Sequence, residues 1–148
     1  MTTVTDVLKT IADDKSLVLF NTIALSNGDT DICLSTLGLT RKQYYSRLSA
    51  LLKAGLVKRE RGKYSLTTFG IIVYNTQETI GNAADQYWKL KAIDAIRASG
   101  TEQLHTIIDK LITNQEIKNI LFKQIKEKPR IFETEINQIS PLNLDNKK

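Results

Sequence analysis

Cysteine and histidine are nearly absent from this 148-residue chain, which contains one of each, Cys33 and His105. A single cysteine excludes an internal disulfide, and these two residues are too few ligands for a structural zinc site within one chain. We therefore expect Cys33 to be a small core residue and His105 to lie on a helix surface. The sequence predicts no metal site and no cofactor.

Long apolar runs and catalytic motifs are also missing. The sequence has no stretch of about 18 uninterrupted apolar residues, and its first residues, MTTVTDVLKTIADDK, have neither a basic nor an apolar leader region. No Gly-rich phosphate loop, Ser/His/Asp set or carboxylate pair beside a base stands out. These absences predict a cytoplasmic protein that does not span a membrane and is not an enzyme.

The composition that is present is that of an ordinary globular protein, with 41% hydrophobic and 25% charged residues. Its net charge of +5 is unevenly distributed along the chain. Residues 40–64 contain eight Lys and Arg against one acidic residue, Glu60, which gives this segment a charge of +7. A basic patch of this kind on a folded element is the electrostatic footprint of a polyanion binder, although a solvated face without a partner can also produce it.

The spacing of apolar residues predicts several helices in the first third of the chain. Ser16 or Asp14 is available to cap the second of them, and Thr40 is placed to cap the last, which ends before Gly55. A short helix, a tight turn and a longer basic helix form a helix-turn-helix pattern. The predicted elements are helices over 5–14, 16–25, 29–38 and 40–53, with a turn at 26–29.

A β-hairpin is predicted directly after this basic helix. The residues from Val57 and the segment KYSL have the alternation of strands, and Arg61-Gly62 is suited to the tip because glycine tolerates positive φ. Thr67 then caps a further helix that begins TFGIIVYNTQ. The predicted fold class is therefore mainly α with a small β-hairpin wing, a winged helix-turn-helix followed by C-terminal helices.

Three short signatures occur in order and at matching separations: LSTLGLT, LLKAGLV and KYSLTTFG. Over roughly residues 5–80 they resemble the winged-helix core of prokaryotic and archaeal transcriptional regulators of the MarR and ArsR types. The resemblance implies a DNA-binding domain over 1–80. The Cys and His metal ligands of ArsR-type repressors are not reproduced, so metal sensing is not implied.

The helix over 40–53 is expected to turn Tyr44, Leu48 and Leu51 inward and its polar residues outward. Gln43 has the groups for a bidentate pair with adenine, and Arg or Lys for one with guanine. Thr40 and the helix N-terminus offer N–H groups to a phosphate, and the hairpin over 57–66 is expected on phosphates or in the minor groove. The predicted DNA-binding residues are Thr40, Arg41, Lys42, Gln43, Tyr45, Ser46, Arg47, Lys58, Arg59, Arg61 and Lys63.

The remainder of the chain is predicted to be a helical region over 81–128, followed by a flexible tail over 129–148. A capping box is expected from Thr113 to Glu116. The apolar stripes of this region need a partner surface, which is either the same chain or a second copy. The resemblance implies that terminal helices form a homodimer. The predicted dimerisation residues are Tyr87, Trp88, Leu104, Ile107, Ile108, Leu111, Ile117, Ile120 and Leu121.

These observations favour a transcriptional regulator that binds double-stranded DNA as a homodimer. Two other functions remain open at this point. A winged helix can serve as a protein–protein interaction module, and the same basic patch can bind chromatin or RNA without reading bases. Neither the operator, nor the direction of regulation, nor a small-molecule effector follows from the sequence.

Overall fold

The computed structural model describes residues 2–26, 36–100 and 102–126, in which helices predominate and the only sheet is a two-stranded antiparallel hairpin. The predicted mainly helical class with a small hairpin is confirmed. The predicted turn at 26–29, the helix over 29–38 with Cys33, and the tail over 129–148 lie largely or wholly outside the described residues. None of the helices in the described ranges has the length and apolar character needed to cross a bilayer.

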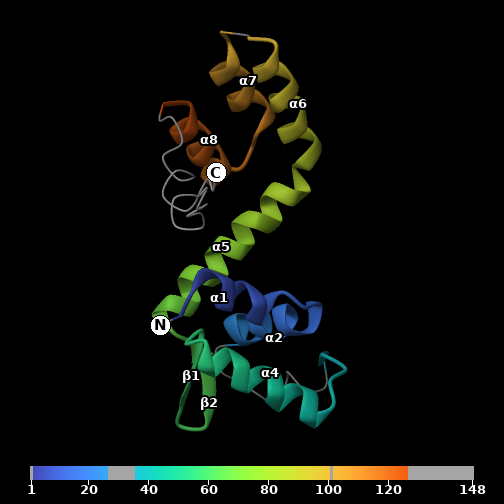
Figure 1. Ribbon diagram of the computed structural model, residues 1–148, viewed down its shortest axis with the longest axis vertical. Helices are drawn as coiled ribbons and strands as arrows, with labels where there is room; N and C mark the ends of the chain where they lie inside the picture. Colours follow the sequence, from blue (N-terminus) through green and yellow to red (C-terminus); the bar gives the residue numbers. More distant parts are fainter. Residues whose placement is uncertain (1, 27–35, 101, 127–148) are drawn as a thin grey trace, which may run out of the picture. The chain divides into compact units, whose positions relative to one another are not determined.

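The chain forms two compact units, Met1–Ile80 and Gly81–Lys148. The first contains helices α1, α2 and α4, the hairpin of β1 and β2, and the beginning of α5 (Figure 1). The second contains the end of α5 and the helices α6, α7 and α8.

The first two helices begin at side-chain caps. Helix α1 (Val4–Ile11) starts with a capping box in which Thr3 and Asp6 satisfy each other's backbone N–H groups. Helix α2 (Asp14–Leu25) is capped by Asp13, whose Oδ1 accepts the backbone N–H of Ser16 at 3.1 Å. The expectation that Ser16 or Asp14 would cap α2 is therefore wrong. Asp13 has the extended backbone that a cap requires, and Ser16 is the residue whose N–H is satisfied.

Helix α4 (Arg41–Lys53) follows the prediction closely. Thr40 is its N-cap, and the chain turns away at Gly55, where φ is +73°. Tyr44, Leu48 and Leu51 are its buried residues, at spacings of four and three. The polar side chains between them are consequently directed away from the core.

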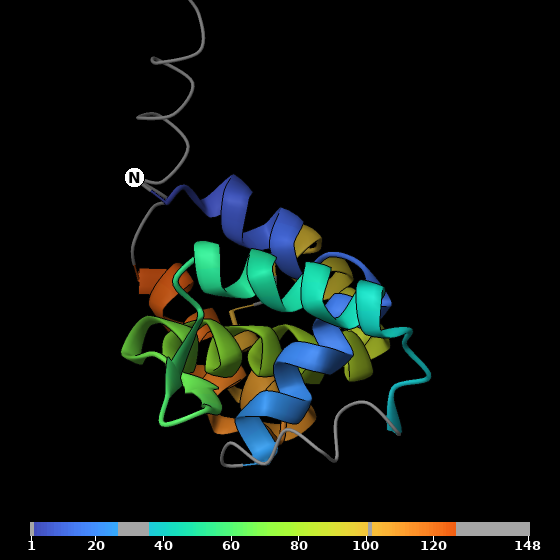
Figure 2. The same cartoon turned by 90° about the horizontal axis from the view of Figure 1, so that it is seen from below.

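The hairpin consists of β1 (Val57–Glu60) and β2 (Lys63–Leu66), joined by a two-residue turn. Arg61 and Gly62 have φ of +50° and +81°, so both central residues are left-handed, as a type I′ turn requires. The predicted hairpin tip is confirmed. In Figure 2 the hairpin extends from the end of α4.

One threonine connects the hairpin to helix α5 (Thr68–Asp85). The Thr67 hydroxyl donates to the carbonyl oxygen of Gly55 at 2.6 Å and accepts the N–H of Gly70 at 2.8 Å. Thr67 therefore caps α5, as predicted, and holds its first turn against the chain that enters β1. Gly70 is buried there, and a Cβ built on it would lie 1.9 Å from the carbonyl oxygen of Leu56.

The core of the first unit is formed by one apolar cluster contributed by every element. Phe20 is fully buried and meets Tyr74 of α5 in an edge-to-face contact, with ring centroids 6.3 Å apart. Helix α4 and the base of the hairpin both contribute buried residues to this cluster, which holds them in place. The buried members are Val7, Ile11, Leu19, Phe20, Ile23, Leu39, Tyr44, Leu48, Leu51, Leu56 and Val57.

The second unit has a separate core between α6 (Tyr87–Ala98), α7 (Leu104–Leu111) and α8 (Gln115–Lys126). Helix α8 is capped by Asn114, whose side-chain oxygen accepts the N–H of Ile117 at 3.0 Å. The capping box predicted from Thr113 to Glu116 is therefore wrong: the cap is Asn114, and the residue three positions later, Ile117, has no side-chain acceptor with which to complete a box. The buried core residues are Ile93, Ile108, Ile112 and Ile117.

Candidate nucleic-acid interface

The first turn of α4 presents polar side chains to solvent. Arg41, Lys42 and Gln43 are all exposed, and Tyr45 is 58% exposed, whereas the adjacent Tyr44 is 2% exposed. The two tyrosine rings meet edge to face at 5.2 Å. The outward face predicted for this helix is therefore the one that the structure exposes.

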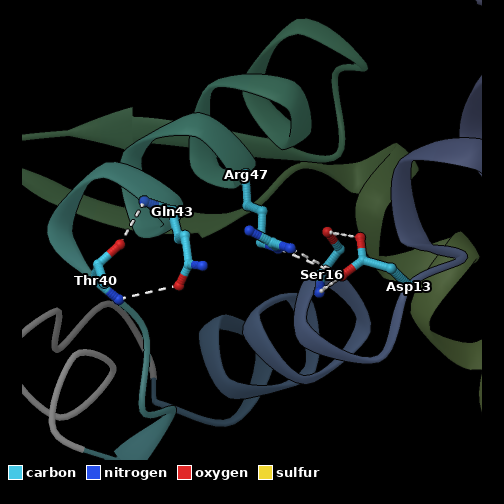
Figure 3. Close-up of polar contacts among 5 residues, drawn as sticks. All are labelled: Asp13, Ser16, Thr40, Gln43 and Arg47. Carbon is cyan, nitrogen blue, oxygen red and sulfur yellow. Dashed lines mark hydrogen bonds and ion pairs between the residues drawn. The ribbon is translucent and has the colours of Figure 1, made fainter.

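Thr40 and Gln43 are engaged with each other at the start of α4 (Figure 3). The Gln43 N–H donates to the Thr40 hydroxyl oxygen, and the Thr40 N–H donates to the Gln43 side-chain oxygen, both at 3.2 Å. Pairing with adenine needs the side-chain oxygen and the amino group of glutamine together. While this capping box is closed, the Gln43 oxygen is held toward the Thr40 N–H, so the predicted bidentate reading of adenine does not fit this conformation.

Arg47 lies differently from the other basic residues of α4. Its Nη2 lies 3.3 Å from Oδ1 of Asp13, and its Nε donates to the same oxygen at 3.4 Å (Figure 3). The Arg47 side chain is only 26% exposed. Arg47 thus connects α4 to the start of α2, and its charge is partly compensated before any ligand binds.

Asp13 is the acidic residue on which these contacts converge. Its pKa lies below the usual range of an aspartate, chiefly because its carboxylate accepts a hydrogen bond from the Ser16 hydroxyl, and also because Arg47 is nearby. Nothing local in the sequence indicates the pair, since the two residues are 34 positions apart. Sequence reasoning assigned Arg47 to DNA and missed its acidic partner.

We expect the Asp13 contribution to stability to depend on pH. The pKa is lowered in the folded state, so the ionised carboxylate stabilises the fold above the unfolded value of about 4, and this stabilisation is lost as the pH falls through the lower folded value. Asp13→Asn keeps a capping oxygen but removes the charge. Because the side chain is 53% exposed, we expect a loss of less than about 1 kcal/mol at pH 7 and a smaller loss at pH 3.

Urea unfolding of the variant and the wild type at both pH values measures this difference. Asp94→Asn makes the same change of charge at an exposed position of α6 and is the control. A deficit for Asp13→Asn that is equal at pH 7 and pH 3 would contradict a role for the carboxylate charge.

The hairpin carries the second group of basic side chains. Lys58, Arg59, Arg61 and Lys63 are all exposed, and Arg61 is the first residue of the turn. The Arg59 guanidinium lies over the ring of Tyr64, its cross-strand partner, at 5.6 Å from the centroid. This contact orients Arg59 without neutralising it.

One acidic residue lies within this basic hairpin. Lys58 Nζ is 3.1 Å from Oε2 of Glu60, two positions further along the same face of β1. Strand alternation places the two side chains together, so this pair could have been predicted from the sequence. Both members are well exposed, so the pair adds little stability, and the lysine can exchange it for a phosphate.

The predicted dimerisation residues fall into three groups in the structure. Ile108 and Ile117 are buried in the core of the second unit, so they present no surface to a second chain. The prediction that these two residues form the dimer contact is therefore corrected. Tyr87, Trp88 and Ile120 are exposed, Trp88 at 74%. The others, Leu104, Ile107, Leu111 and Leu121, are partly buried.

Comparison of the chain with protein-family models, with curated proteins and with solved structures finds no match. What this chain does is therefore inferred from its residues and their geometry.

Proposed function

We propose that the first unit is a winged helix that binds double-stranded DNA and regulates transcription, and that the protein acts as a homodimer. Helix α4 enters the major groove, and the hairpin is the wing, which contacts phosphates or the minor groove. The order of α4, a short connection and a two-stranded hairpin supports this assignment. So does the core, which holds α4 and the base of the hairpin in one cluster.

The observation that carries the proposal is the exposure of the basic side chains in the +7 segment. Arg41 and Lys42 in the first turn of α4 are exposed, as are all four basic residues of the hairpin. Exposed Lys and Arg on two neighbouring elements supply the phosphate contacts that dominate affinity for duplex DNA.

A second candidate function follows from the engagement of two predicted base readers. Gln43 is in the capping box and Arg47 is paired with Asp13, which favours contacts with the phosphate backbone over base contacts. The alternative is therefore a binder of duplex nucleic acid without strong sequence preference. In vitro selection from random duplexes separates the two: a recovered motif supports the regulator, and unenriched pools support the alternative.

Removing three wing charges should reduce the salt dependence of DNA binding. For the triple variant Arg59→Ala, Arg61→Ala, Lys63→Ala, we expect the slope of log K against log salt to fall by about 2–3, close to one unit for each lost phosphate contact. The measurement is a fluorescence anisotropy titration of a labelled duplex at several salt concentrations.

The matched control is a triple alanine variant at Lys110, Lys123 and Lys126, three exposed lysines of the second unit. It removes the same charge from the chain and should leave the slope within about 0.5 of the wild type. If both triple variants flatten the slope equally, the effect is one of total charge and the wing assignment fails. If wild-type protein binds no duplex even at low salt, the proposed function itself fails.

A further inference from the structure

Asp13 is an acidic residue in contact with the proposed DNA-binding surface. It lies outside the basic segment over residues 40–64, yet its carboxylate is paired with Arg47, which belongs to that segment. One of the eight basic side chains counted there is therefore already matched by an acid from another helix. Including this acid lowers the net charge of the surface from +7 to +6.

The pair engages one edge of the Arg47 guanidinium. Nε at 3.4 Å and Nη2 at 3.3 Å both donate to Oδ1 of Asp13 (Figure 3). Two N–H groups on one edge are also what an arginine offers to a phosphate. In this structure those two groups of Arg47 are directed to a carboxylate instead.

The Asp13 carboxylate is itself held in place by Ser16. Its Oδ1 accepts the backbone N–H of Ser16 at 3.1 Å, and its Oδ2 accepts the Ser16 hydroxyl. Ser16 is buried at 4% exposure. These hydrogen bonds, chiefly the one from the hydroxyl, lower the pKa of Asp13, so its carboxyl is ionised at neutral pH. Because Asp13 is also the N-cap of α2, moving its carboxylate toward solvent would disturb the start of that helix.

The ion pair of the hairpin differs in this respect. In the Lys58–Glu60 pair the side chains are 47% and 68% exposed, against 26% and 53% for Arg47 and Asp13. An exposed pair of flexible side chains on one strand is weak and exchanges readily. Arg47 and Asp13 instead connect two helices, α4 and α2, whose buried residues belong to one core. Lys58 can therefore turn to a phosphate, whereas Arg47 stays with Asp13.

We propose that Asp13 holds Arg47 back from the DNA backbone and thereby lowers the affinity of the first unit for duplexes of any sequence. This role depends on the proposed function, because it concerns the same surface. Each cation that reaches a phosphate adds affinity whatever the bases are. A regulator must find its site among a large excess of non-specific DNA, and withholding one arginine weakens that competing binding. Asp13 acts through Arg47, so it is a positioning residue rather than a contact residue.

The test is a fluorescence anisotropy titration of a labelled duplex of random sequence with the full chain, wild type and Asp13→Asn, between about 50 and 200 mM salt. Asparagine keeps a capping oxygen but loses the charge that holds Arg47. We expect Asp13→Asn to bind about 3- to 10-fold more tightly at the lowest salt, with a slope of log K against log salt that is steeper by about 0.9, as for one added phosphate contact. The gain should consequently shrink about 3.5-fold across this range of salt.

Two controls separate this effect from a general change of charge. Asp14→Asn removes the same charge one position further along, at an exposed residue in the first turn of α2, and should leave the slope within about 0.3 of the wild type. In an Arg47→Gln background, adding Asp13→Asn should bring no further gain, because no cation remains to be released. Circular dichroism melting establishes that each variant is folded. Asp13→Ser, which also keeps a capping oxygen, takes the place of Asp13→Asn if that variant unfolds.

NMR of the arginine Nε–H groups follows the same event at the side chain. When duplex is added to the wild type at low salt, the signals of Arg59 and Arg61 should shift more than that of Arg47. In Asp13→Asn the Arg47 signal should shift together with the other two.

Several results would overturn this role of Asp13: an unchanged slope in Asp13→Asn, an equal gain in Asp14→Asn, or the same gain whether or not Arg47 is present. Each of these leaves the proposed function standing, because the wild type still binds duplex through its other basic residues. Wild-type protein that binds no duplex even at low salt would refute the proposed function, and the role of Asp13 with it.

Discussion

Gly70→Ala is expected to lower the free energy of unfolding of the first unit by about 3 kcal/mol or more. The new Cβ would lie 1.9 Å from the carbonyl oxygen of Leu56 and 2.9 Å from its carbonyl carbon. Both are backbone atoms, so no side chain can rotate away to relieve the overlap.

Movement of the Leu56 carbonyl would disturb other contacts. This oxygen accepts the backbone N–H of Thr67 at 3.0 Å, directly before α5 begins. The side chain of Leu56 is itself fully buried in the core of the first unit. The substitution therefore separates the start of α5 from the base of the hairpin, and the hairpin is expected to lose its fixed position together with the stability.

The matched control is Gly81→Ala in the same helix. A Cβ at Gly81 would meet no atom within 4 Å, and the residue is exposed. Alanine there should stabilise α5 by about 0.5–1 kcal/mol, because it loses less backbone freedom on folding than glycine. Thermal unfolding followed by circular dichroism measures both variants. Equal and small effects of the two substitutions would contradict the close approach of α5 to Leu56.

The second large effect is expected at two adjacent tyrosines that differ in burial. Tyr44→Ala should cost about 3–5 kcal/mol, as does the removal of other buried aromatic side chains, because Tyr44 packs in the core of the first unit at 2% exposure. Tyr45→Ala removes the same side chain from a position that is 58% exposed and should change stability by less than about 1 kcal/mol. Urea unfolding of both variants gives the comparison.

The same pair tests the orientation of α4 toward DNA. Tyr45→Ala is expected to weaken duplex binding while the fold remains intact, since Tyr45 is on the proposed contact face. Tyr44→Ala is expected to lose binding only in proportion to unfolded protein. If Tyr44→Ala abolished binding with no loss of stability, the helix would be rotated by about one residue from the orientation proposed here.

Most of the secondary structure in the first unit could be predicted from the sequence. Thr40, Gly62 and Thr67 have the cap and turn positions expected of them, and the inward face of α4 is the one predicted. Each of these features depends on interactions between residues at most four positions apart, such as a hydroxyl that accepts the N–H three residues later. The sequence of a few neighbouring residues is therefore sufficient to predict such features.

Two predictions of helix caps failed because they were choices between neighbouring residues of similar chemistry. Asp13 caps α2 where Ser16 or Asp14 was expected, and Asn114 caps α8 where Thr113 was expected. Serine, threonine, aspartate and asparagine are all good caps. Which of them is used depends on where the backbone of the first turn begins, and that is set by the packing of the whole helix.

The sequence by itself determined the basic hairpin, the outward face of α4 and the presence of apolar stripes along the helices, because period and local hydrogen bonding decide these features. The tertiary structure alone decided which stripes are covered. The α7 and α8 stripes meet in a core at Ile108 and Ile117, whereas Leu8 of α1 and Ile72 of α5 remain exposed. It also brought Arg47 to Asp13 across 34 residues. Apolar residues at helical spacing indicate that one face of a helix must be covered. The element that covers this face is determined by contacts between residues distant in the chain, which no local pattern encodes.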